Sequence, residues 1–121
     1  MLNINNCDYF APVSHYNKPQ RTNFAIYDKD NSKILSTVRF NYMFPALQAV
    51  VHKLIIKDVY KTDSRYAILV AKEYDYCSKH EDHLRKRALS VYKIGCNKGH
   101  FLNQSCCDFL KLEGEYYKYR R

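Results

Sequence analysis

The sequence contains no tryptophan, only three glycines and three prolines, and no long apolar run. A helix that spans a membrane needs about 20 predominantly apolar residues, so we expect no contact with a membrane. The scarcity of glycine and proline leaves no linker-like or low-complexity stretch within the chain. We therefore predict one domain over residues 1–121, whose first segment, 1–22, is polar and partly irregular.

A secretory signal is also missing, because the first residues, MLNINNCDYF, have neither a basic start nor a long apolar stretch. The five cysteines are an odd number, which argues against a closed set of disulfides and favours a reducing compartment. Lysine, asparagine, tyrosine and isoleucine are abundant, as in small proteins of AT-rich viruses and phages. The composition thus predicts an intracellular protein, viral or phage-encoded, in the cytoplasm or nucleus of a host cell.

Positive charge exceeds negative charge, with 20 Lys and Arg against 12 Asp and Glu and a formal net charge of +8. Residues 51–100 alone carry 11 basic and 6 acidic side chains. A surplus of this kind attracts polyanions, although it does not determine a fold. Many basic proteins bind no nucleic acid, and that interpretation stays open beside the polyanion-binding one.

The pattern of apolar residues predicts an α+β fold with a mostly antiparallel sheet. NFAIYD and KILSTVRFNY are typical of the two strands of a hairpin around the turn residues KDNS. Pro45 suits the first turn of a helix, and apolar spacing predicts one long amphipathic helix over about 45–60. We further expect a strand in RYAILVAKEYDY, a helix from Lys79, a strand in SVYKIG, a short helix through CCDFLKL and a closing edge strand in EYYKYRR.

Two short-spaced pairs of cysteine and histidine have the chemistry of a structural zinc site, which uses four such ligands. They are Cys77-x2-His80 and Cys96-x3-His100. An explanation without metal is that Ser78 and Glu81 cap a helix while the cysteines behave as small, half-buried apolar side chains. We predict no cofactor, with zinc held by these four residues as the open alternative.

Two clusters of side chains suit a nucleic acid, because cations can follow its phosphates while aromatic rings stack on its bases. They are Arg85, Lys86 and Arg87 on a predicted helix, and Tyr117, Lys118, Tyr119, Arg120 and Arg121 in the C-terminal tail. The tail is equally compatible with an edge strand whose charges prevent pairing with another chain. We predict that both clusters contact nucleic acid.

We expect no catalytic residue in this chain. Glu73 and Asp75 would project to one face of a predicted strand, but Lys72 would project to the other, so the constellation of a metal-dependent nuclease is incomplete. Catalysis by a Cys–His pair needs a lowered thiol pKa and a precisely placed partner, neither of which spacing establishes. No glycine-rich phosphate loop is present. The chain is therefore predicted not to be an enzyme, with a nuclease-like activity as the alternative.

Three hypotheses for the function remain. The leading one is a small basic protein that engages DNA or RNA through the cationic second half of the chain. The second is a protein-interaction module, such as a viral antagonist of a host protein, because tyrosine and arginine often carry interface energy. The third is a zinc-stabilised module. A homodimer formed through an edge strand is compatible with each of them.

Overall fold

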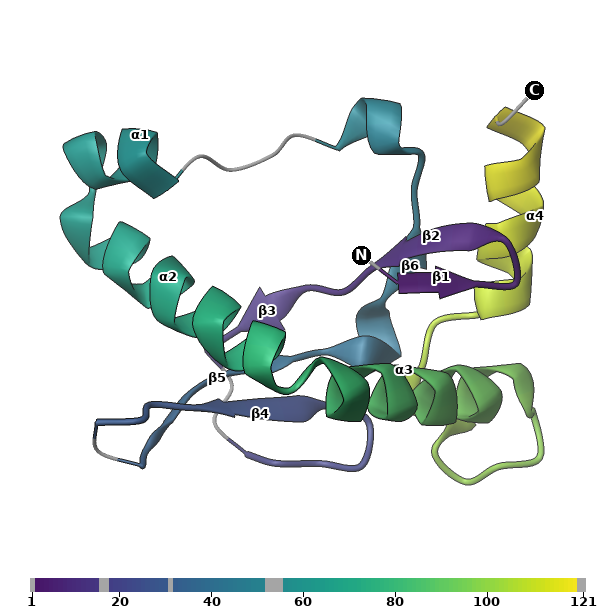
Figure 1. Cartoon of the computed structure of the whole chain (residues 1–121). Helices are drawn as coiled ribbons and strands as arrows, with labels where there is room; N and C mark the ends of the chain where they lie inside the picture. Colours follow the sequence, from purple (N-terminus) through teal and green to yellow (C-terminus); the bar gives the residue numbers. More distant parts are fainter. Residues whose placement is uncertain (1, 16–17, 31, 52–55, 120–121) are drawn as a thin grey trace.

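A computed structural model describes residues 2–15, 18–30, 32–51 and 56–119 of the chain. Strands fill the first part of the chain and helices fill the second (Figure 1). The strands are β1 (Leu2–Ile4), β2 (Cys7–Phe10), β3 (Val13–Ser14), β4 (Phe24–Tyr27), β5 (Ile34–Val38) and β6 (Phe44–Pro45). The helices are α1 (Ile56–Thr62), α2 (Ser64–Lys79), α3 (Glu81–Cys96) and α4 (Phe109–Tyr119). The predicted α+β class with antiparallel strand pairing is confirmed.

The first sheet has the order β1-β2-β6 and begins with a tight hairpin. Asn5 and Asn6 form its turn with positive φ angles of 53° and 61°, and Ile4 pairs with Cys7 across it. A two-residue turn with both residues at positive φ matches the right-handed twist of the strands, and asparagine tolerates that conformation well. The segment 1–22, expected to be partly irregular, therefore holds three of the strands.

The second sheet has the order β3-β5-β4, and its central pair is the predicted hairpin of residues 23–42. Strand β5 ends at Val38, earlier than expected, and Phe40–Tyr42 form one turn of 3-10 helix. The buried side chains of Ile26, Val38 and Phe40 place this hairpin in the core. Figure 1 shows α2 crossing this sheet, in agreement with its contacts to β4 and β5.

The helices differ most from the sequence-based expectations. The helix predicted over 45–60 is only partly present. Pro45 ends β6, Gln48–Val50 form one turn of 3-10 helix, α1 begins at Ile56, and residues 52–55 lie outside the described residues. The strands expected in RYAILVAKEYDY, SVYKIG and EYYKYRR are helical as far as they are described, in α2, α3 and α4. Asp63 explains why RYAILVAKEYDY is helical. Its side chain accepts a 3.0 Å hydrogen bond from the Tyr66 N–H and thereby caps the start of α2. No helix in the described ranges is both long and apolar enough to cross a membrane.

Helix α4 is held to the β1–β2 hairpin by a buried carboxylate. Glu113 is only 3% exposed. It accepts hydrogen bonds from Tyr9 Oη at 2.6 Å, Tyr92 Oη at 2.8 Å and Asn5 Nδ2 at 2.9 Å. Burial first, and the Glu113 carboxylate next, raise the pKa of Tyr9, so its hydroxyl stays protonated and donating. Three donors compensate for the loss of water around this carboxylate.

Candidate nucleic-acid interface

A groove of about 490 Å³ runs along one side of α3 and is rich in cations. Arg21, Lys86, Lys93 and His100 line it, together with Leu89, Ser90, Ile94 and Asn97. We call this surface the basic groove. Within the described part of the chain no aspartate or glutamate lines it. Its potential is therefore set by cations, which suits a polyanionic ligand.

The helix spacing creates one wall of the basic groove. Lys86, Ser90, Lys93 and Asn97 follow one another at intervals of three or four residues, which places them on one face of α3. Eleven residues of helix correspond to about 16 Å at a rise of 1.5 Å per residue. The opposite face of α3 is apolar, and Ala88, Val91 and Gly95 are buried there. The helix thus presents its polar stripe to solvent because its apolar stripe lies in the core.

The second wall is the loop that carries Arg21, and Arg87 holds that loop against α3. The guanidinium Nη1 of Arg87 donates to the carbonyl oxygens of Asn23 at 2.9 Å and Gln20 at 3.2 Å. Buried Asn23 tightens the loop further, since its Oδ1 accepts from the Gln20 N–H at 2.9 Å and its Nδ2 donates to the Lys18 carbonyl at 3.1 Å. These contacts position Arg21 opposite the α3 stripe.

The far end of the groove is formed by the turn after α3. Asn103 Nδ2 donates to the Ile94 and Gly95 carbonyls at 2.9 and 3.0 Å, so it satisfies the C-terminal end of the helix. The Leu102 N–H donates to His100 Nδ1 at 3.1 Å, which leaves the proton of a neutral ring on Nε2. The His100 ring stacks on Phe101 at 4.8 Å, and Phe101 is 73% exposed. This end of the groove therefore offers a hydrogen-bond donor beside an exposed aromatic ring.

A second groove of about 500 Å³ adjoins the first, and Arg21 lines both. It contributes Arg39, whose guanidinium lies 4.9 Å from the centre of the half-exposed Tyr42 ring. Asn41 joins its walls, since its N–H bonds the Thr22 carbonyl and its Nδ2 donates to the Ser105 carbonyl at 3.1 Å. The described lining of this groove also contains no carboxylate. The cationic surface thus continues beyond Arg21 and includes another aromatic ring.

The cations of the basic groove take no part in the ion pairs of the described residues. Among the described residues, the ion pairs engage other basic side chains, namely Lys29, Lys72, Lys79, Arg85 and Lys118. None of those pairs involves Arg21, Lys86 or Lys93. A phosphate that binds these three side chains therefore does not have to displace a carboxylate first.

The structure separates the three members of the predicted cluster on α3. Lys86 lines the basic groove. Arg85 instead forms an exposed pair with Glu81, with Nη2 2.6 Å from Oε1. Arg87 is engaged by the two loop carbonyls described above. Of the three, only Lys86 lines the basic groove. Arg87 contributes indirectly, because it holds the loop that carries Arg21.

The predicted tail cluster lies on a different element. Tyr117, on α4, donates to the Asn5 carbonyl at 2.7 Å, and Lys118 pairs with Glu115 at 3.2 Å. Tyr119 ends α4, and Arg120 and Arg121 lie outside the described residues. In Figure 1 the C-terminal end of α4 points away from α3, so the described tail residues do not extend the basic groove. The contact of both clusters with nucleic acid stays a prediction.

The four predicted zinc ligands are not brought together. Cys77 and His80 lie at the end of α2, whereas Cys96 is the last residue of α3 and His100 follows it. The 16 residues of α3 separate the pairs by about 24 Å at 1.5 Å per residue. Burial, and then Glu73, raise the pKa of the Cys77 thiol to about 11, which disfavours the thiolate that binds metal. Among the described residues no group of three or more Cys, His, Asp or Glu side chains is arranged to hold a metal ion.

Sequence reasoning missed most of the residues that form the cationic surface. Arg21, Arg39 and Lys93 were assigned no role, and His100 was considered only as a metal ligand. A signal for Lys93 was present, because Lys86, Ser90, Lys93 and Asn97 have helical spacing. It was hidden by the strand assigned to SVYKIG. Arg21 lines both grooves and Arg39 lines the second one only through long-range contacts, for which the sequence carries no local signal.

Comparison with known proteins identifies relatives of this fold. Residues 1–118 match the sequence profile of a family described as toxin ToxN of type III toxin–antitoxin systems. No curated protein sequence matches the chain. One similar solved structure comes from work on bacterial type III toxin–antitoxin systems, on selective toxin inhibition by a non-coding RNA pseudoknot. It is 26% identical, covers 100% of this chain and 77% of its own, and has a TM-score of 0.88.

Two further solved structures share the fold at lower identity. AbiQ, a lactococcal anti-phage endoribonuclease of the type III toxin–antitoxin class, is 20% identical over 96% of this chain and 74% of its own, with a TM-score of 0.79. A chain from a bacterial antiviral system regulated by a processed non-coding RNA is 18% identical over 98% of this chain and 75% of its own, with a TM-score of 0.77.

These matches overturn the prediction about enzymatic activity and bear on those about the partner, the origin and the location of the protein. The prediction that the chain is not an enzyme is wrong, because the matched family is that of a toxin, and AbiQ, which has this fold, is an endoribonuclease. The predicted nucleic-acid partner is supported at the level of RNA. A viral origin, a host-protein partner, a host-cell location, a homodimer and a zinc-stabilised module receive no support from the matches.

Proposed function

The chain belongs to the ToxN family of type III toxin–antitoxin toxins, and on that premise we propose that it is a bacterial endoribonuclease that holds its RNA in the basic groove. The observation that carries the proposal is the position of Arg21, Lys86 and Lys93, which line one groove without an acidic neighbour among the described lining residues. The endoribonuclease AbiQ supports the reaction type through its shared fold.

The groove is suited to a single strand more than to a rigid duplex. Its two helix cations, Lys86 and Lys93, lie about 10 Å apart along the axis of α3. Phe101 and Tyr42 expose rings on which unpaired bases can stack. Stacking on aromatic side chains and contacts between cations and phosphates are the two elements of single-strand binding. His100 adds a donor from Nε2, which suits a phosphate oxygen.

RNA carries its own nucleophile, the 2′-hydroxyl beside each phosphate. Attack by that oxygen forms a bond to phosphorus while the bond to the 5′-oxygen of the next nucleotide breaks. One proton leaves the 2′-hydroxyl and one is delivered to the departing oxygen. Fixed cations accelerate such a step by stabilising the charge that develops on the phosphoryl oxygens. The basic groove supplies those cations, so electrostatic stabilisation is the role we assign to Arg21, Lys86 and Lys93.

The test is a cleavage assay of the purified chain with a single-stranded RNA and with the same sequence carrying 2′-O-methyl groups. We expect fragments of the RNA with 5′-hydroxyl and 2′,3′-cyclic phosphate ends, and no cleavage of the methylated strand although it binds. Lys93→Met should slow cleavage, whereas Lys111→Met, which removes an exposed charge on α4, should not. Intact RNA with the unmodified protein, or equal rates for the two variants, would contradict the proposal.

An RNA inhibitor of this toxin would act by occupying the same surface. The solved structure that is 26% identical comes from work on toxin inhibition by a non-coding RNA pseudoknot, which supports inhibition by an RNA. The surface that such an RNA occupies is our inference from the basic groove. We place the encounter inside the bacterial cell, where both the toxin and its RNA substrates are made. A structured RNA that inhibits this toxin should compete with a 2′-O-methyl strand for binding. Simultaneous binding of both RNAs would show that the inhibitor lies elsewhere.

A further inference from the structure

A separate pocket of about 390 Å³ lies between the β4–β5 turn and α2. It is within the range of about 300–1,000 Å³ that is typical of small-ligand sites. Its walls are mainly apolar, formed by Tyr27, Ile68, Ala71 and Tyr76, and its polar rim includes Asp75, Lys79 and His80. The basic groove does not include any of these residues.

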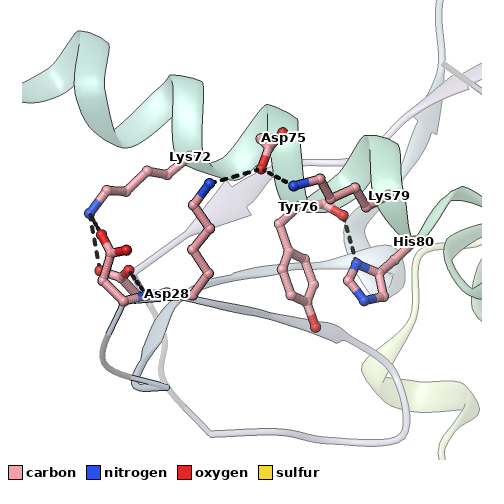
Figure 2. A network of polar contacts seen from close by, with 8 residues as sticks. Asp28, Lys72, Asp75, Tyr76, Lys79 and His80 are labelled. Carbon is pink, nitrogen blue, oxygen red and sulfur yellow. Dashed lines mark hydrogen bonds and ion pairs between the residues drawn. The ribbon is translucent and has the colours of Figure 1, made fainter.

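The pocket presents flat aromatic walls. The Tyr27 and Tyr76 rings are 6.2 Å apart at 53°, and His80 stacks on Tyr76 with centroids 4.1 Å apart. Figure 2 shows the Tyr76 and His80 rings side by side as they descend from α2. The ring of His80 is fixed by a 2.8 Å hydrogen bond to the Tyr76 carbonyl, which places a proton on Nδ1. Such a surface suits a planar ring system, because π-faces pack in offset or tilted stacks.

The rim places a carboxylate beside ammonium groups. Asp75 Oδ2 lies 3.1 Å from Lys79 Nζ and 3.9 Å from Lys29 Nζ, and Figure 2 shows Asp75 beside Lys79 on α2. The hydrogen bond from Lys79 is the main cause that lowers the pKa of Asp75, so its carboxylate is ionised and can only accept hydrogen bonds. All three side chains are substantially exposed. Exposed ion pairs of this kind contribute little stability, so a ligand can bind to the carboxylate and the ammonium groups with only a small loss of free energy.

We propose that this pocket is a binding subsite for a guanine base, with its ring against Tyr76 and its Watson–Crick edge on Asp75 and Lys79. Guanine presents two adjacent donors on that edge, N1–H and the N2 amino group, which one carboxylate can accept together. The neighbouring O6 is an acceptor and matches the ammonium of Lys79. Adenine and cytosine each present a single donor group on this edge, and uracil presents one N–H between two acceptors, so none of them satisfies the pair.

The position of the pocket links it to the proposed RNA site, and this step depends on the proposed function. His80 lines the pocket, and its ring is 6.2 Å from His83 on the first turn of α3. From His83 the same face of α3 continues through Lys86 and Ser90 to Lys93, about 15 Å along the helix axis. A strand that follows the basic groove can therefore deliver one base to the pocket. The subsite would give the toxin a preference for guanine at one position of its RNA.

The matched variants for the test are Asp75→Asn and Asp30→Asn. Asparagine at position 75 keeps the shape of the aspartate side chain but has an NH₂ donor in place of one acceptor oxygen. Its side chain therefore cannot accept hydrogen bonds from both N1–H and the N2 amino group of guanine. Asp30 belongs to the same polar network through Lys72, 3.6 Å away, but it does not line the pocket. Its replacement removes the same charge nearby. Circular dichroism would confirm that both variants are folded.

Calorimetric titration with GMP, AMP, CMP and UMP tests the pocket without any cleavage. We expect GMP to bind at least tenfold more tightly than the other three. Asp75→Asn should abolish that preference, and Asp30→Asn should keep it. Equal affinities for the four nucleotides, or a guanine preference that survives Asp75→Asn, would overturn the assignment.

A second arm distinguishes a base within RNA from a free nucleotide. Oligouridine RNAs with one central guanine or one central adenine, methylated at 2′-oxygens, should differ at least fivefold in affinity for the unmodified protein and not for Asp75→Asn. Selective GMP binding without this difference would assign the pocket to free guanine nucleotides and refute the RNA subsite. Absence of cleavage would refute the proposed function but leave the nucleotide result standing.

Discussion

The hydroxyl of Tyr9 donates a 2.6 Å hydrogen bond to the carboxylate of Glu113, which lies 104 positions later in the chain. Tyr9 is fully buried and Glu113 nearly so. The bond joins the N-terminal hairpin to the last helix and thereby closes the scaffold on which α3 presents the basic groove.

Tyr9→Phe removes this donor without changing the ring. Hydrogen bonds to charged groups contribute about 1.5–3 kcal/mol, so we expect a loss of about 2 kcal/mol in the free energy of unfolding. Urea denaturation followed by circular dichroism measures it. Tyr74→Phe is the control, because Tyr74 is 71% exposed, and surface changes usually stay within about 0.5 kcal/mol. Equal losses for both variants would contradict the role of the buried bond.

Two helical glycines provide opposite outcomes for the same substitution. A Cβ at Gly95 would overlap the Phe109 ring, whereas one at Gly114 meets no atom within 4 Å. Gly95→Ala should therefore destabilise the protein by about 1–3 kcal/mol through overpacking. Gly114→Ala should stabilise it by about 1 kcal/mol, since alanine favours helix over glycine. Thermal denaturation of both variants should shift in opposite directions, and a shift in the same direction would refute the close contact between α3 and α4.

Two arginines on α3, Arg85 and Arg87, should differ sharply in their contribution to stability. Arg87→Met removes two charge-assisted bonds to the loop carbonyls of Gln20 and Asn23, for a loss of about 2–3 kcal/mol in stability. Arg85→Met removes only an exposed pair with Glu81, worth about 0.3–0.5 kcal/mol. Arg87→Met should also weaken RNA binding, because Arg21 loses its fixed position. Equal effects of the two variants on urea midpoints would show that the loop does not depend on Arg87.

Stability should fall in acid partly through the buried Asp28. The N–H of Asp30 is the main cause that lowers the pKa of Asp28, and the ammonium of Lys72, 3.2 Å away, adds to it. A lowered folded-state pKa contributes stability above the unfolded value, and that contribution is lost as pH falls through the folded value. Urea midpoints should therefore decline below about pH 4. Lys72→Met should lose less stability over this range of pH, because the folded-state pKa of Asp28 then lies closer to the unfolded value. An equal acid loss in the variant and the unmodified protein would contradict the coupling.

Part of the fold was predictable from local patterns. The β4–β5 hairpin follows from alternating apolar residues around KDNS, and β1–β2 could have been found from Asn5-Asn6, which is a common type of two-residue turn. Helix α2 was missed because Tyr66, Ile68 and Val70 favour strands. Its cap, Asp63, comes just after the helix predicted over 45–60 and was therefore not recognised as the start of α2.

The site was less predictable than the fold class. A run of basic residues indicates a cationic surface, but it does not tell which charges are free to bind. Arg85 and Arg87 are used within the protein, and Lys86 between them is not. Arg87 and Gln20 are 67 positions apart, so the wall that carries Arg21 arises from tertiary packing. Enzymatic activity was missed for a related reason, because in the proposed reaction the RNA supplies the nucleophile, so the chain needs no nucleophilic side chain that a sequence motif would reveal.

The most direct measurement is the salt dependence of binding to a 2′-O-methyl RNA strand. Each phosphate contact to a single strand contributes about 0.7 to the slope of log affinity against log salt. Replacement of Arg21, Lys86 and Lys93 by alanine should therefore weaken binding and reduce the slope by about 2. The control replaces Lys57, Lys61 and Lys111, which are exposed and outside both grooves, and should leave the slope unchanged. Equal slopes for the two triple variants would contradict the basic groove as the RNA-binding surface.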